Sequence, residues 1–214
     1  MSLENISPTR INLIQTKKTL DFARSGRDIL ERKRDILIRE LRQSIYEAER
    51  TRDELQTLFS KALQSLHDAT MESGNVAVYN AAIASSFKAY FVSDYRSIMG
   101  VLVPIIEFKG EDHPKPDYGF SGTNASLDRA FRQFYSLLTI IAELAREEGI
   151  VFQLANDIRK TQRRVNALDI VLIPQYKEAV KRIELVLEEK DREEFVRTKT
   201  VKRKIKERAT RIGF

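Results

Sequence analysis

Hydrophobic residues recur every seven positions through about the first 70 residues of the chain. One row consists of Leu13, Leu20, Arg27, Arg34, Leu41, Ala48, Leu55, Ala62 and Ala69. From Arg10 to Met71 the only helix breaker is Gly26. A heptad repeat is typical of a helix that packs against another helix in a left-handed coiled coil. We therefore expect a coiled-coil helix over residues 10–72, in which two arginines interrupt the apolar row.

A second heptad row runs through the C-terminal half of the chain. Its eight positions are all apolar: Leu137, Leu144, Val151, Ile158, Val165, Leu172, Ala179 and Val186. The only breakers between Thr123 and Arg211 are Gly149 and Pro174. The pattern predicts a second coiled-coil helix over residues 123–210. Because proline lacks a backbone N–H, we expect this helix to bend near Pro174.

The two helical arms belong to one chain, which decides how they are expected to pack. A connector of about 50 residues allows them to fold back on each other as an antiparallel pair, with both termini at one tip. The alternative is that each arm pairs with another chain in an intermolecular coiled coil. The predicted fold class is all-α: a long antiparallel two-helix left-handed coiled coil with a short β-hairpin and a loop between the arms.

The middle segment, residues 73–122, differs from both arms. Residues 100–122 hold seven of the thirteen Gly and Pro residues, and the segment also contains a run of aromatic and β-branched residues. We expect the end of the first helix, then strands at about 88–97 and 101–108 joined at Met99 and Gly100, then a loop. An isolated hairpin is only marginally stable in water, so this one must pack against the coil or another protein.

Charge is concentrated near the two ends of the chain. The whole chain has 37 Lys and Arg against 31 Asp and Glu, a net charge of +6. Residues 10–34 contain eight bases and three acids, and residues 197–211 contain eight bases and one acid. In an antiparallel pair these two basic segments lie at the same end. No run of residues has the apolar length of a membrane-spanning helix.

Catalytic chemistry is not indicated anywhere in the sequence. There is no cysteine, no phosphate-binding glycine motif and no pair of metal-binding histidines on a helix. The cluster Glu111, Asp112 and His113 is interpreted as a solvated loop. We expect no catalytic residue, no cofactor and no metal. The arginines within the heptad rows either extend from the edge of the coil into solvent or contact a partner protein.

Three separated sequence elements stand out along the chain. The first is Pro8, Thr9 and Arg10, followed by Leu13, Lys17, Leu20, Ala23, Gly26, Leu30 and Lys33 to Asp35. The second is the hairpin element Ser97 to Val101 with Pro104. The third is TQRRVNALD, in which the matching residues are Thr161, Gln162, Arg163, Arg164, Asn166 and Leu168, with Pro174 after them. Together these three elements resemble the D subunit of the archaeal and vacuolar-type rotary ATPases, and the resemblance covers the chain from Pro8 to about Lys199.

This resemblance implies a non-catalytic central-stalk subunit, the rotor shaft that couples ion translocation through a membrane ring to ATP synthesis or hydrolysis. Its partners would be the catalytic and regulatory head subunits (A and B), the stalk subunit (F) and the cap subunit of the membrane ring (C or d). Residues in the head bore would be Arg10, Lys17, Lys18, Arg24, Arg27, Arg34, Lys199, Lys202, Arg203 and Lys206. Residues facing the stalk partner would be Tyr90, Tyr95, Ile98, Met99 and Val101.

The location implied is the cytoplasmic side of the membrane, reached only through partners. The alternative function is a basic coiled-coil adaptor that binds nucleic acid or a membrane surface. Against nucleic acid, the basic tail has no aromatic platform and no known DNA-binding motif, so we expect no nucleic acid partner. Against a membrane surface, the tail offers little apolar bulk for burial in lipid.

Overall fold

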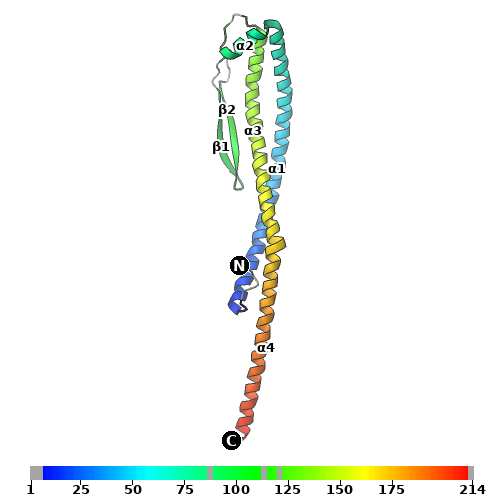
Figure 1. Cartoon of the computed structure of the whole chain (residues 1–214), viewed down its shortest axis with the longest axis vertical. Coiled ribbons are helices and arrows are strands. Elements are labelled where there is room, and N and C mark those ends of the chain that lie inside the picture. Colours follow the sequence, from blue (N-terminus) through cyan, green and yellow to red (C-terminus); the bar gives the residue numbers. More distant parts are fainter. Residues whose placement is uncertain (1–6, 86–88, 112–114, 120–121, 212–214) are drawn as a thin grey trace. The chain divides into compact units, whose positions relative to one another are not determined.

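A computed structural model describes residues 7–85, 89–111, 115–119 and 122–211 of the chain. Long helices dominate it, and one two-stranded antiparallel sheet lies between them in the sequence, which confirms the predicted fold class (Figure 1). The elements are α1 (Arg10–Ser73), α2 (Asn75–Ala84), β1 (Tyr90–Ile98), β2 (Val101–Lys109), α3 (Ala125–Asn166), a π-helical segment η2 (Ala167–Leu172) and α4 (Ile173–Arg211). Asp112 and His113 of the acidic loop cluster lie outside the described residues.

The ends of α1 follow from local chemistry. Thr9 precedes the helix, and its hydroxyl oxygen accepts a hydrogen bond from the backbone N–H of Asn12 at 3.2 Å. Such a cap satisfies a donor that has no partner within the first turn. Gly74 follows the helix with φ of 81°, a conformation that other residues adopt at a cost. The 64-residue helix therefore stops at Ser73, and α2 begins at once.

The chain divides into two compact units, one formed by the segment up to residue 32 with the segment from residue 160 onward, the other by residues 33–159. In the first unit, Leu20 and Ala23 of α1 form a buried cluster with Ile173 and Val180 of α4. Ion pairs join Arg10 to Asp191 and Lys17 to Glu184. Since higher numbers on α1 meet lower numbers on α4, the two segments are antiparallel.

The C-terminal arm does not keep the heptad row predicted for it. Leu172 and Val186 are 37% and 36% exposed, whereas Ile173 and Val180 are only 4% and 8% exposed. The cause is η2, whose wider turn is closed by the N–H of Ile173 donating to the carbonyl of Leu168. A π-helical turn adds one residue to the helix, so Ile173 and Val180 enter the buried surface, while Ala179 of the predicted row stays buried at 4% exposure. Predicting one unbroken row was wrong at this point.

The expectation that both termini lie at one tip is also corrected within the first unit. Arg10, at the start of α1, lies opposite Asp191 of α4. The helix α4 continues beyond Asp191 to Arg211, as Figure 1 shows. At 1.5 Å per residue this adds about 30 Å of helix. Among residues 192–206 every residue is exposed except Thr200, which is half-buried. This stretch of α4 extends past the coiled coil as a single helix.

In the second unit, α1 and α3 pack through small side chains. Ala48, Ala62 and Ala69 of α1 are buried, as are Ala130 and Ala142 of α3. An exposed ion pair of 2.6 Å joins Arg52 to Glu148 across the two helices. Larger side chains, among them Leu37 and Leu137, are buried in this unit as well.

The hairpin packs against α3, as expected because an isolated hairpin is only marginally stable in water. Met99 and Gly100 join its strands in a two-residue turn with φ of 51° and 82°, the positive values of the turn that suits paired strands. Val103 of β2 is fully buried with Leu37, Ile150 and Leu154. At the other end of β2, the Phe108 ring lies 5.4 Å from that of Tyr135, edge to face. The helix–strand contact therefore runs along the length of β2.

Gly149 of α3 is needed for this contact. A Cβ atom added there would lie 2.7 Å from Cγ of Pro104, inside the normal contact distance. Gly149 therefore lets Pro104 approach the helix surface. Among the described residues, no helix is long and apolar enough to cross a membrane.

Candidate subunit-interaction surfaces

The predicted basic residues of α1 are mostly engaged within the chain. Arg10 and Lys17 pair with Asp191 and Glu184 of α4 at 3.1 and 2.6 Å. Arg24 pairs with Asp21 on its own helix at 3.3 Å. For Lys18, which is exposed, the structure shows no comparable carboxylate contact among the described residues. The clustered positive charge counted from the sequence is therefore largely balanced by carboxylates.

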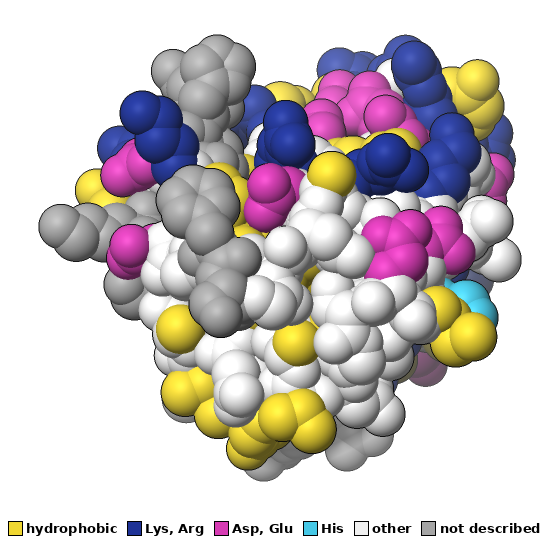
Figure 2. Space-filling view, turned by 90° about the horizontal axis from the view of Figure 1, so that it is seen from above, with side chains coloured by type: hydrophobic (Ala, Val, Ile, Leu, Met, Phe, Trp, Pro, Cys, Tyr) yellow, Lys and Arg dark blue, Asp and Glu magenta, His cyan; other side chains and the backbone are white. Residues whose placement is uncertain are grey.

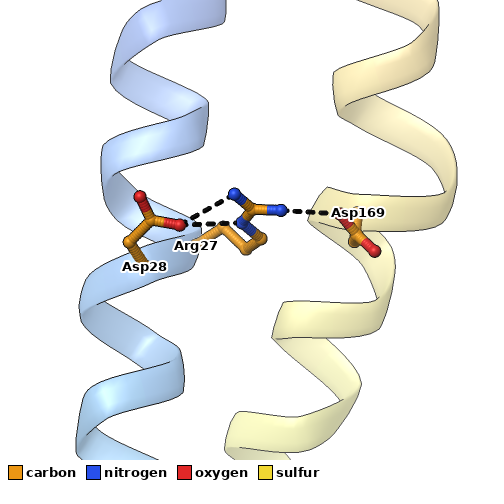
Figure 3. Close-up of polar contacts among 3 residues, drawn as sticks. All are labelled: Arg27, Asp28 and Asp169. Carbon is orange, nitrogen blue, oxygen red and sulfur yellow. Dashed lines mark hydrogen bonds and ion pairs between the residues drawn. The ribbon is translucent and has the colours of Figure 1, made fainter.

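Arg27 is the most strongly held of these bases (Figure 3). Its guanidinium lies 2.8 Å from Oδ1 of Asp28 and 3.1 Å from Oδ1 of Asp169, on the π-helical segment. These hydrogen bonds, first to Asp28 and then to Asp169, raise the pKa of Arg27 above its ordinary value. An arginine at a heptad position that a coiled coil normally fills with leucine is thus bonded across the pair of helices. It joins this turn of α1 to the π-helical segment.

Arg34, in the second unit, pairs with its neighbour Asp35 at 2.9 Å. Beside it, Lys33 reaches Asp157 of α3 at 3.4 Å. Of the two arginines in the predicted row, Arg27 bridges two segments, and Arg34 contacts Asp35 on its own helix.

The single-helix stretch of α4 beyond Asp191 carries the remaining predicted bases. Lys199, Lys202, Arg203 and Lys206 are all exposed there. Four large apolar side chains are exposed on the same stretch: Phe195, Val196, Val201 and Ile205. Sequence reasoning gave these four no partner contact, because the tail was judged to offer too little apolar bulk for a lipid surface and no aromatic platform for nucleic acid. A helix with both basic and apolar side chains exposed is suited to contact another protein.

The third sequence element has mixed roles. Thr161 is buried, and Leu168 packs against the Leu20 cluster. The amide nitrogen of Gln162 donates to the side-chain oxygen of Asn166 at 2.7 Å, one turn later. Arg163, Arg164 and Pro174 are exposed. The element therefore combines core residues of the first unit with polar residues at its surface.

The hairpin residues predicted to face a stalk partner are only partly accessible. Tyr90, Tyr95 and Met99 are exposed. Ile98 is half-buried against the core of the second unit, and Val101 is 6% exposed within that core. Including Val101 among surface contacts was wrong, because its side chain packs on Leu37, Ile150 and Leu154. Two residues not selected from the sequence are exposed and extend the accessible apolar surface: Phe91 and Leu102.

A further surface lies at α2, for which the sequence predicted no role. Val76, Tyr79 and Ile83 are exposed at a spacing that places them on one face of the helix, and Met71 is exposed near the end of α1. No residue from Ser73 to Ser85 carries a charge. Seen from this end, hydrophobic and uncharged side chains fill one side of the surface, and charged side chains lie on the other (Figure 2). The absence of charged residues from Ser73 to Ser85 is the sequence feature that could have identified this surface.

Comparison with known proteins gives a consistent match over almost the whole chain. The family model for the D subunit of ATP synthase matches residues 12–203. The chain is 40% identical over 203 residues to the D subunit of the V-type ATP synthase of Thermotoga neapolitana, covering 94% of this chain and 98% of that protein. It is 36% identical over 208 residues to the D subunit of the A-type ATP synthase of Methanosphaera stadtmanae, covering 96% and 97%. It is also 36% identical over 216 residues to that of Methanopyrus kandleri, covering 98% and 93%. The chain therefore belongs to the family of ATP synthase D subunits.

Proposed function

We propose that this chain is the central-stalk rotor shaft of an A/V-type ATP synthase or ATPase and works together with the other subunits of that complex. It couples ion translocation through a membrane ring to ATP synthesis or hydrolysis in the catalytic head, and it performs no bond chemistry itself. The observation that carries this proposal is the match to the D-subunit family across residues 12–203. A match to one helical arm alone would also fit an unrelated protein that contains a similar coiled-coil helix.

The first unit supports a role inside the head formed by the catalytic and regulatory subunits (A and B). Its α1 bases are bonded to carboxylates of the same unit, so they stiffen the pair of helices rather than reaching for the head. Contacts with the head fall instead to Lys18, Lys199, Lys202 and the exposed apolar residues of α4. Exposed charge pairs contribute only about 0–1 kcal/mol each. Contacts this weak can be exchanged as a shaft turns.

The second unit offers surfaces for the other partners. The exposed aromatic residues of the hairpin suit the stalk subunit (F). The uncharged apolar surface of α2 suits the cap subunit (C or d) of the membrane ring, because exposed apolar patches mark protein contacts. The chain then reaches the cytoplasmic side of the membrane through these partners alone. No contact with nucleic acid is part of this proposal.

Affinity purification from the native cell tests the proposal. A tagged chain, recovered gently from membranes, is analysed by quantitative mass spectrometry and by an ATP hydrolysis assay. We expect one copy of this chain per three catalytic subunits, together with ATPase activity. Recovery of nucleic acid, or of the chain alone without ATPase subunits, would contradict the proposal and favour a basic adaptor.

A pair of variants tests the surface of α2 in the same preparation. Ile83→Asp places a charge on the apolar face, and we expect the head subunits to remain bound while the membrane sector is lost. Asn75→Asp adds the same charge at the start of α2, where the helix dipole favours it, and serves as the control. Equal recovery of the membrane sector with both variants would exclude this surface as the contact with the cap subunit.

A further inference from the structure

The outer edge of the hairpin is an unusual feature of the second unit. In the described part of the chain, β1 pairs with β2 alone, and seven of its nine residues are exposed. The strand is nine residues long and contains no proline. Natural proteins usually protect such edges with short strands, prolines or covering elements, because a free edge pairs readily with another chain. This edge is long enough to accept another strand.

The register shows which backbone groups point outward. Tyr95 of β1 lies opposite Pro104 of β2. Proline has no N–H, so this cannot be a pair that exchanges two hydrogen bonds. The pairs that each exchange two hydrogen bonds are instead the adjacent ones, Asp94 with Ile105 and Arg96 with Val103. By the alternation of an antiparallel ladder, the backbone groups of Phe91, Ser93, Tyr95 and Ser97 point away from β2.

A hydrogen bond in the structure agrees with this assignment. The backbone N–H of Tyr95 donates to Oδ1 of the neighbouring Asp94 at 2.7 Å. That N–H is therefore outside the ladder and satisfied locally by a carboxylate. The Asp94 side chain is short and can rotate away from this N–H. A backbone carbonyl of an added strand can then accept the hydrogen bond in its place.

The side chains on this edge indicate what kind of strand fits. Phe91 and Tyr95 lie on one face of the hairpin together with Leu102, and all three are exposed. Asp94 and Arg96 lie on the other face with opposite charges. An added strand would therefore carry apolar residues on the first face. On the second face it would carry a base near Asp94 and an acid near Arg96.

We propose that the free edge of β1 accepts an extended strand from a stalk partner protein, which adds a third strand to the hairpin through the backbone groups of Phe91, Ser93, Tyr95 and Ser97. This inference rests on the proposed function, since one copy of the chain on the axis of a rotary complex leaves a different protein as the occupant. Strand addition is an established way for proteins to bind peptides, with main-chain bonds providing affinity and side chains providing selectivity.

Amide exchange measured by NMR on the full chain, free and bound to the purified stalk partner, tests this directly. In the free chain we expect slow exchange at Val92 and Arg96, whose N–H groups are in the ladder, and fast exchange at Ser93 and Ser97. Binding should slow exchange at Ser93 and Ser97 by at least about tenfold. Unchanged exchange at these two residues in a stable complex would overturn strand addition and leave the proposed function intact.

Two substitutions at one position give a matched test of affinity. Ser93→Pro removes an outward N–H while keeping the ladder, because proline is tolerated on the solvent side of an edge strand. Ser93→Ala removes the hydroxyl and keeps the N–H. We expect the proline variant to bind the stalk partner at least about tenfold more weakly and the alanine variant within about twofold of the parent. Equal affinity of all three proteins would refute the proposal.

The remaining outcomes are also decisive. If the free chain is a dimer in which Ser93 and Ser97 already exchange slowly, the occupant is a second copy and the proposal is wrong. If the parent chain forms no complex with any stalk partner, the proposed function fails and this inference fails with it. Slow exchange at Val92 and Arg96 in the free Ser93→Pro variant shows that its hairpin has kept its fold.

Discussion

Substitution of Gly149 by alanine tests how the hairpin is held on the helix. The added Cβ atom would lie 2.7 Å from Cγ of Pro104 and 3.7 Å from its Cδ. The first distance is well below ordinary contact, so Pro104 and the strand around it must move away from α3. That movement would disturb the neighbouring contact of Val103 with Ile150 and Leu154.

The magnitude follows from two opposing effects. Overpacking in a well-packed region costs about 1–3 kcal/mol. Replacing glycine by alanine inside a helix raises the free energy of unfolding by about 1 kcal/mol through helix propensity, apart from any tertiary contact. Gly26 supplies the matched control, because it is inside α1 and a Cβ atom added there would have no neighbouring atom within 4 Å. The difference between the Gly149→Ala and Gly26→Ala variants therefore isolates the clash with Pro104, at about 1–3 kcal/mol.

Urea unfolding followed by circular dichroism measures these changes in the free energy of unfolding. Gly26→Ala should stabilise the chain by about 1 kcal/mol. Gly149→Ala should fall short of that gain by the cost of the clash. Pro104→Ala removes the opposing Cγ atom, so in the double variant the penalty at Gly149 should largely disappear. Equal stabilisation by Gly149→Ala and Gly26→Ala would refute the packing of Pro104 on α3.

Four further predictions concern single side chains. Leu154→Ala, at a fully buried position of the second unit, should lower the free energy of unfolding by about 2–5 kcal/mol in the same assay; a loss below about 1 kcal/mol would mean that this core is not packed as described. Arg10→Ala should change it by less than about 1 kcal/mol, because the pair with Asp191 is exposed; a larger change would indicate a stronger role. Burial is the main cause that raises the pKa of the Tyr118 hydroxyl, and its hydrogen bond to Asp128 is the second. The neutral hydroxyl therefore stabilises the folded chain below about pH 10, and this contribution is lost as the pH rises further. The parent should therefore lose stability relative to Tyr118→Phe above about pH 10, and parallel pH curves would contradict this. We expect the bend predicted at Pro174 to make the shaft present different faces to the surrounding catalytic interfaces, so Pro174→Ala should lower the coupling of ion flow to ATP turnover in reconstituted vesicles; unchanged coupling would refute this role.

The helices and the hairpin could be predicted from local patterns. Heptad rows identified both arms, and the cluster of Gly and Pro residues marked the segment between them. The turn at Met99 and Gly100 was placed correctly, because Gly100 lies between two runs of strand-forming residues. These signals are local, so no knowledge of packing was needed to interpret them.

The π-helical segment could not be predicted because both possible rows are apolar. Leu172 continues the row that contains Val165, while Ile173 begins the row that contains Val180. A shift of one residue therefore exchanges one hydrophobic position for another, and periodicity cannot choose between them. The ion pair between Arg27 and Asp169 depends on this register, which is why it was also missed.

The interaction surfaces were predicted least well, for two physical reasons. β2 begins with consecutive apolar residues, so alternation does not tell which of Val101 and Leu102 faces the core. The charge-free helix α2 has the composition of a buried element, yet its apolar residues are exposed. Burial at both sites depends on what lies beside the element, and a single sequence does not contain that information.

The most direct test of the central claim is observation of rotation in single complexes. The chain contains no cysteine, so Tyr79→Cys provides one attachment point on the exposed face of α2. With the head fixed to a surface and the membrane sector absent, a bead is attached at this cysteine. The account predicts that ATP drives the bead in one direction with three pauses per turn, one for each catalytic interface. A head that hydrolyses ATP at its normal rate while the bead shows only Brownian motion would contradict it.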